Sequence, residues 1–129
     1  MKFFAVAVAL VAASVANAQN TWTNCGTNPD AVIDTFITSP SPGCIGKPVC
    51  ATATGHLNVP ITSPSALSII GKYLGQTVYV DNHDLCALLA VQGHPCPVPV
   101  TVTSLTACVV IKDSAPANIP VTLTISAIN

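Results

Sequence analysis

The 129-residue sequence contains no arginine and no glutamate. Its charged side chains are four lysines and five aspartates, which give a net charge of −1 at pH 7. A protein that binds nucleic acid needs several cations on one face, and lysines scattered along the chain do not supply such a face. A polybasic membrane anchor is excluded on the same ground. We therefore expect neutral or apolar partners and no binding to nucleic acid.

Sequence motifs of the common enzyme classes are also absent. There is no Gly-x-Ser-x-Gly elbow and no glycine-rich phosphate loop. A glycosidase needs two facing carboxylates, and the sequence does not identify any two of the five aspartates as such a pair. Asp81 and Asp84 flank His83, but a charged turn at the end of a strand is the ordinary explanation of such a group. We expect no enzymatic activity and no cofactor.

The three histidines do not predict a metal site. His56, His83 and His94 fall in three different segments, and no two of them have the i, i+4 spacing of a helical ligand pair. The cysteines are better explained as disulfides than as zinc ligands. We expect no bound metal.

The first eighteen residues have the features of a cleaved secretory signal peptide. Lys2 gives the positive start, residues 3–15 are apolar, and residues 16–18 form a small-x-small cleavage site. The apolar run is too short to span a membrane. We expect one domain over residues 19–129, in a protein secreted to the extracellular space or to a vacuolar or endolysosomal lumen.

All of the cysteines follow this segment: Cys25, Cys44, Cys50, Cys86, Cys96 and Cys108. An even number in a small secreted chain predicts a disulfide framework, although six cysteines allow fifteen connectivities. A bridge between Cys86 and Cys96 would close a small loop. Cys44 and Cys50 bracket a turn that is short enough for a local bridge.

Hydrophobic alternation, interrupted by proline-rich breaks, predicts about six strands. They are residues 31–38, 49–57, 65–73, 77–80, 98–111 (with a slip of phase near 104–105) and 121–128. Only residues 85–90 suggest a turn of helix. The fold class is therefore all-β, an immunoglobulin-like antiparallel β-sandwich with disulfides. The antibody version is excluded because the single tryptophan, Trp22, lies near the N-terminus.

The segment 49–57 alternates cleanly, and one of its faces carries mostly small side chains. This face consists of Val49, Ala51, Ala53, Gly55 and Leu57. Small side chains on an inner face leave space, which is either a pocket or is filled by larger side chains of the opposite sheet.

Short motifs occur in a characteristic order along almost the whole of residues 19–129. They are NCG at 24–26, SPSPGC at 39–44, CATATG at 50–55, GKYLG at 71–75, VY at 78–79, DLC at 84–86, CPV at 96–98 and NIPV at 118–121. The series resembles the ML lipid-recognition domain family. This family includes the Niemann–Pick sterol-transfer protein and the secreted fungal phosphatidylglycerol/phosphatidylinositol transfer proteins, and the fungal branch looks most similar.

The resemblance implies a two-sheet sandwich with an apolar pocket for a lipid tail or a sterol, and disulfides Cys44–Cys50 and Cys86–Cys96. The family's first cysteine, which matches Cys25, pairs with a cysteine on a final strand. This sequence ends at Asn129, where that strand should begin. Either Cys108 is the partner of Cys25, or the sequence is a fragment that lacks the last strand.

We expect a monomer that carries a sterol or phospholipid and makes transient contact with membranes. The predicted lipid-binding positions are Phe36, Val49, Ile69, Val78, Val80, Val98, Val100, Leu123 and Ile125, with Tyr73, Tyr79 and Pro97 near the mouth. Ordinary core packing would explain each of these positions individually. The alternative function is a secreted sandwich with a filled core that binds protein or cell-wall surfaces.

Overall fold

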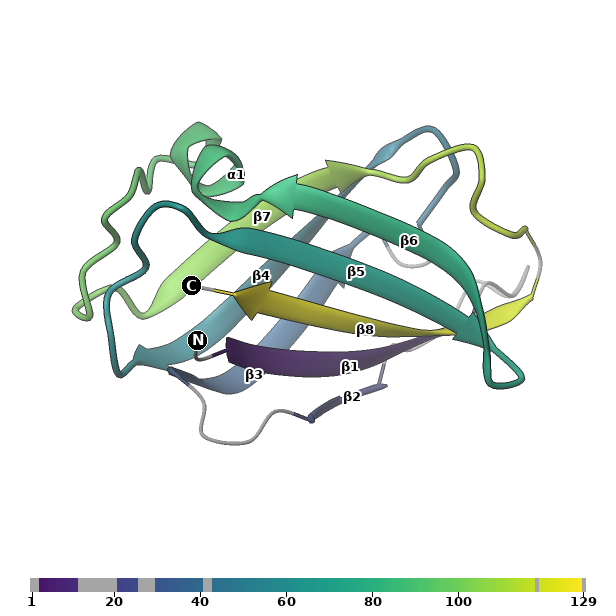
Figure 1. The fold of residues 1–129 in the computed structure, drawn as a ribbon, viewed down its shortest axis with the longest axis horizontal. Helices are drawn as coiled ribbons and strands as arrows, with labels where there is room; N and C mark the ends of the chain where they lie inside the picture. The colour runs from purple at the N-terminus through teal and green to yellow at the C-terminus, as the bar shows by residue number, and fades with distance from the viewer. Residues whose placement is uncertain (1–2, 12–20, 26–29, 41–42, 118, 129) are drawn as a thin grey trace.

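The computed structural model describes residues 3–11, 21–25, 30–40, 43–117 and 119–128. These residues form eight strands and one short helix (Figure 1). In chain order they are β1 (Phe3–Val11), β2 (Thr21–Asn24), β3 (Ala31–Ser39), β4 (Pro48–Leu57), β5 (Ala66–Tyr73), β6 (Gln76–Asp84), α1 (Leu85–Val91), β7 (Ser104–Val110) and β8 (Pro120–Ile128).

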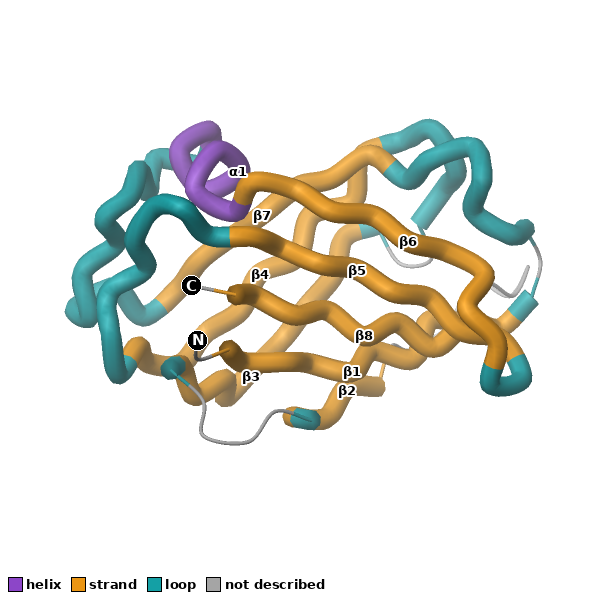
Figure 2. The backbone as a smooth tube through the Cα atoms, viewed as in Figure 1, coloured by secondary structure: helices purple, strands orange, loops and turns teal. Residues whose placement is uncertain are grey.

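The strands form two antiparallel sheets that face each other (Figure 2). The larger sheet has the order β2-β1-β8-β5-β6, and the smaller sheet has the order β3-β4-β7. The prediction of an all-β, immunoglobulin-like sandwich is confirmed. No helix in the described part of the chain is long and apolar enough to cross a membrane.

The segment predicted as one long strand, residues 98–111, divides into a loop and a strand. Only Ser104–Val110 forms β7, and Val98 makes an isolated bridge with Ile61. Prolines at 95, 97 and 99 explain the loop, because proline has no backbone N–H to donate to a strand ladder. The slip of phase noted near 104–105 therefore marks where the strand begins.

Helix α1 closes one end of the sandwich. The Asp84 carboxylate caps it by accepting a hydrogen bond from the Ala87 backbone N–H at 3.2 Å. Leu85 and Leu89 are buried, with Leu89 only 2% exposed. They belong to the main core cluster together with Ile61, Leu67, Ile69, Val98 and Ala127. The single turn of helix expected at residues 85–90 is therefore a seven-residue helix that seals the core.

Strand β1 comes from the segment predicted as a signal peptide. It pairs with β8 over nine residue pairs, from Phe3 opposite Ile128 to Val11 opposite Pro120. Strand β8 is thus paired on both sides, with β1 and with β5. The predicted cleavage site at residues 16–18 lies outside the described residues, and the removal of residues 1–18 stays a prediction. Such removal would take β1 away and expose the backbone edge of β8.

Candidate functional site

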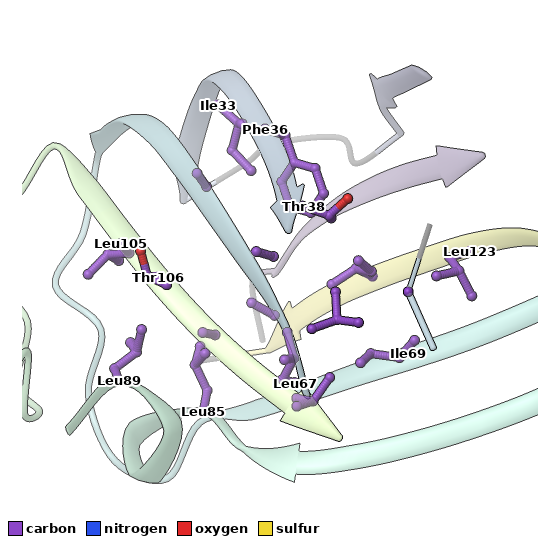
Figure 3. A pocket seen from close by; sticks show the side chains of 18 of the residues that line it. Ile33, Phe36, Thr38, Leu67, Ile69, Leu85, Leu89, Leu105, Thr106 and Leu123 are labelled. Carbon is purple, nitrogen blue, oxygen red and sulfur yellow. The ribbon is translucent and has the colours of Figure 1, made fainter. Parts of the chain in front are cut away.

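An apolar cavity of about 180 Å³ lies between the two sheets. Strands of both sheets and helix α1 contribute to its wall, as the side chains in Figure 3 show. Its lining residues have no polar side-chain atoms except for Thr38, Thr106 and Tyr79, each of which carries a hydroxyl group. A cavity with so few polar groups offers water almost no hydrogen bonds, so it favours an apolar occupant.

The space exists because the smaller sheet presents short side chains to the interior. Ala51 and Ala53 of β4 and Ala107 of β7 line the cavity. On the opposite wall, Ile69 of β5 and Leu123 of β8 face them without filling the gap. The small-residue face that the alternation of residues 49–57 indicated therefore borders a cavity.

The cavity is closed at one end and approaches the surface at the other. At the closed end, Leu85 and Leu89 of α1 and the bridged residue Ile61 line the wall. At the other end, the lining comes from residues where β3 ends, β4 begins and β7 ends. This set, which we call the mouth, consists of Thr38, Pro40, Gly43, Val49 and Ile111. Among the described residues, no helix covers the mouth as α1 covers the opposite end.

Six of the twelve predicted lipid-binding residues line this cavity. They are Phe36, Val49, Ile69, Tyr79, Leu123 and Ile125. Three of them, Val49, Leu123 and Ile125, lie where clean alternation of apolar and polar residues identified an inward face. Whether these side chains contact a lipid stays a prediction.

The prediction of which residues of strand β6 face inward was wrong. Val78 and Val80 were expected to face inward, but Val80 is 47% exposed and neither residue lines the cavity. Tyr79 and Asp81 point inward instead. The sequence Thr77-Val78-Tyr79-Val80 is apolar or β-branched at every position, so its composition did not show which face is buried.

The other four predicted positions also lie outside the cavity lining. Val98 is buried in the core at 1% exposure, and Val100 is 44% exposed in the loop before β7. Pro97 is exposed and follows Cys96, which is bridged to Cys86 of α1, so it is not a mouth residue. Tyr73 is half-buried at the end of β5 and does not contact the cavity.

A polar cluster connects the edges of the two sheets beside the cavity. The Asp81 carboxylate, 6% exposed, lies 2.8 Å from His83 Nε2 and 3.7 Å from Lys112 Nζ. The Tyr79 hydroxyl donates to Asp81 at 3.3 Å and accepts from the Lys112 backbone N–H at 3.2 Å. Because Tyr79 lies on β6 and Lys112 follows β7, these bonds join the larger sheet to the smaller one.

The same environment favours the neutral form of the tyrosine. Burial raises the pKa of the Tyr79 hydroxyl above its ordinary value. The hydrogen bond from the Lys112 backbone lowers this pKa, whereas the nearby charge of Asp81 and its hydrogen bond raise it. The cluster was interpreted from the sequence as a charged turn, and that was wrong because residues 81–84 belong to β6. Tyr79, Asp81 and His83 have the i, i+2, i+4 spacing of residues on one face of a strand, and this spacing could have indicated the cluster.

The disulfides agree only partly with the expectation. Cys86–Cys96 is present and ties α1 to the loop that follows it. The second bridge joins Cys50 to Cys108, and Cys25 and Cys44 are free and exposed. The expected bridge Cys44–Cys50 is therefore absent, and so is Cys25–Cys108, which was one of the two alternatives left open for Cys25. Cys50 and Cys108 lie directly opposite each other in the β4–β7 ladder, a register that the sequence did not reveal.

This pairing predicts a specific pattern of thiol reactivity. Alkylation of the folded, unreduced protein should label Cys25 and Cys44 and leave the other four cysteines unmodified, because the thiolate is the reactive species and only these two thiols are free. Peptide mapping by mass spectrometry reads the labels directly. Labelling of Cys108 together with protection of Cys44 would contradict the observed pairing.

The described residues contain no group of three histidine, cysteine, aspartate or glutamate side chains that could hold a metal ion. The polar cluster contains one buried carboxylate and no nucleophile beside a base. Its geometry supports a structural connection between the sheets.

Comparison with known proteins identifies the family. A family model of the ML domain matches residues 19–129, which is most of the chain. A search of curated proteins finds no match. The ML domain family is a lipid-binding, non-enzymatic family, and the two-sheet sandwich with an apolar interior agrees with that description. The chain belongs to the ML domain family.

Proposed function

We propose that this protein is a secreted monomeric carrier that binds the apolar part of one sterol or phospholipid between its two sheets and transfers it between membranes. The observation that carries this proposal is the cavity, whose wall is apolar almost throughout. The sequence resemblance to sterol-transfer and phospholipid-transfer proteins supports the choice of ligand. The two disulfides support secretion, since disulfides persist in oxidising compartments.

Transfer is energetically reasonable for such a site. Burial of a hydrocarbon chain contributes about 0.8 kcal/mol per CH₂, so sixteen carbons contribute on the order of 12 kcal/mol. A membrane supplies nearly the same stabilisation. A lipid can therefore move between bilayer and cavity at almost balanced free energy, which favours exchange over permanent storage. No covalent step is needed.

The size of the cavity implies that the sheets move apart when a lipid enters. Its volume of about 180 Å³ is below the ~300–1,000 Å³ typical of ligand pockets. Helix α1 and the Cys86–Cys96 bridge hold the closed end together. We therefore expect the sheets to separate at the mouth, where the movement would break the hydrogen bond from the Lys112 backbone to Tyr79.

The alternative function, a surface-binding sandwich, requires a filled core, and the cavity argues against it. Titration with a fluorescent sterol and a fluorescent phospholipid tests the proposal. We expect saturable binding of at least one probe at one molecule per chain. Absence of binding by both probes would contradict the carrier.

A further inference from the structure

A second hollow, which we call the polar groove, lies where the loop after helix α1 meets the beginning of strand β7. Its volume is about 440 Å³, larger than that of the apolar cavity. Its walls are the start and the end of the loop that joins α1 to β7, together with the first residues of β7 (Figure 1). Six of its seven lining residues have polar side chains: Gln92, His94, Thr101, Thr103, Ser104 and Thr106.

Strand β7 separates the polar groove from the apolar cavity. Side chains alternate along a strand, so Leu105 lines the cavity while Ser104 lines the groove, and Thr106 borders both spaces. The mouth of the cavity lies near the other end of β7, beside Ile111. A lipid that enters through the mouth therefore does not occupy the groove, and the function proposed above gives the groove no role.

The chemistry of the groove lining is polar without lysine or aspartate. Among the described residues that line it, none supplies the cation that a phosphate or a carboxylate needs, or the carboxylate that an amine needs. The polar groups are four hydroxyls, one amide and one imidazole. Hydroxyls and amides both donate and accept hydrogen bonds. Such a set matches a neutral ligand that itself carries many hydroxyl groups.

The polar groups of the groove are accessible to a ligand. Thr101, Thr103 and Ser104 are exposed, and so is Gln92. His94 is half-buried, and its Nδ1 atom is buried without a hydrogen-bond partner among the described residues. The ring nitrogen that remains for a ligand is therefore Nε2. The groove thus offers hydroxyls, an amide and one ring nitrogen from two separate parts of the chain.

Both walls of the groove are held in place by the rest of the fold. On the helix side, the His94 backbone N–H donates to the Leu89 carbonyl at 2.9 Å, and Cys96, two residues further on, is bridged to α1. On the strand side, the Thr106 hydroxyl lies 2.8 Å from the Thr52 hydroxyl of the neighbouring strand β4. Groups that are positioned in advance lose less conformational entropy when a ligand binds.

We propose that the polar groove binds a neutral oligosaccharide through hydrogen bonds to its hydroxyls, to the Gln92 amide and to the His94 ring. The volume of the groove lies within the ~300–1,000 Å³ that is typical of ligand pockets. Water competes for each hydrogen bond in an open groove, so each bond contributes little net affinity. We therefore expect a dissociation constant on the order of 1 mM. The sugar is a second ligand, additional to the lipid and bound at a separate site.

Amide NMR of the isotope-labelled protein tests the inference. Laminarihexaose and maltohexaose, two neutral glucose oligomers, are titrated alongside trigalacturonic acid, an anionic sugar. We expect saturable shifts of the amides at residues 92–94 and 101–106 with at least one neutral oligomer. Trigalacturonic acid should bind more weakly, because the groove has no cation to pair with its carboxylates. Absence of saturable shifts with both neutral oligomers, or equal affinity for the anionic sugar, would overturn the inference.

Two variants each remove one hydrogen-bonding group from the groove. Gln92→Ala removes the amide, and Thr103→Val replaces the hydroxyl by a methyl group. Each should weaken binding of the neutral oligomer about fivefold, which is the effect of one lost hydrogen bond. Both residues are exposed, so the melting temperature should change little.

Gln76→Ala and Thr77→Val are the matched controls. Both residues are exposed on β6, and neither lines the groove. They should leave sugar binding unchanged. Equal losses in the control variants and in the groove variants would contradict the assigned site. Shifts centred on the residues of the apolar cavity would do the same, because the sugar would then occupy the lipid site.

A lipid titration separates this inference from the proposed function. Gln92→Ala should bind a fluorescent lipid as tightly as the unaltered protein, because Gln92 does not line the cavity. Weaker lipid binding by this variant would contradict the separation of the two sites. If the unaltered protein binds lipid but no neutral sugar, only the groove proposal is wrong. If it binds the sugar in the groove but no lipid, only the carrier is wrong.

Discussion

Replacing Ala51 by phenylalanine should strongly reduce lipid uptake and leave the protein folded. Ala51 lies on β4 with its side chain in the cavity wall, facing the larger sheet. A phenyl ring at this position would occupy the space that the proposed lipid tail needs. We expect binding of a fluorescent lipid to weaken at least about tenfold, since even a few unburied CH₂ groups cost that much affinity.

Stability should change in the opposite direction to binding. An empty cavity of 180 Å³ costs roughly 4 kcal/mol of folding free energy, taken at ~24 cal/mol per Å³. Filling part of it should keep or raise the melting temperature. Ile69→Phe and Leu123→Trp, at two other cavity positions, should also reduce uptake more than they lower the melting temperature.

The matched control for this series is Val80→Phe. Val80 is 47% exposed on the outer side of β6, so the larger ring there does not enter the cavity. Lipid titration and thermal unfolding are measured on all variants. Undiminished uptake by Ala51→Phe, or the same loss in Val80→Phe, would mean that lipid does not occupy this cavity.

Removing the buried carboxylate of Asp81 should have the largest effect on stability. Asp81→Ala leaves the Tyr79 hydroxyl, the His83 ring and the Lys112 ammonium without the acceptor they share. Breaking a buried, charge-assisted network of this kind costs about 2–4 kcal/mol. That is a large part of the ~5–15 kcal/mol by which a domain of this size is stable. Urea unfolding at pH 7 measures the loss.

Two further variants distinguish the effect of losing the hydrogen-bond acceptor at Asp81 from the effect of losing a negative charge. Asp81→Asn keeps an acceptor oxygen and should cost less than the alanine variant. Asp113→Asn removes an exposed charge from the same end of the molecule and should change the free energy of unfolding by no more than about 0.5 kcal/mol. If Asp81→Ala is as mild as Asp113→Asn, the cluster does not hold the sheets together.

The sequence predicted the fold class well because most strands carry a clear signal. Residues 121–128 alternate apolar and polar side chains, and β8 occupies almost the same range. Strand β4 likewise presents its small side chains to the interior, as its alternation indicated. Proline-rich breaks separated these segments. Local pattern was sufficient wherever one face of a strand is apolar and the other is polar.

Local pattern failed where the outcome depends on contacts between distant segments. Both faces of Val78–Val80 are compatible with burial, and the bonds from Lys112 to Tyr79 and Asp81 accompany the inward placement of the odd-numbered residues. The Cys50–Cys108 bridge follows from the β4–β7 register, which joins residues 58 positions apart.

The central claim is that a lipid occupies the space between the sheets, and organic extraction of the purified protein tests it most directly. Mass spectrometry of the extract should find one sterol or phospholipid per chain. The extract from Ala51→Phe, prepared in the same way, should contain far less. An unaltered protein that is well folded and yields no lipid, even after incubation with lipid vesicles, would contradict the account.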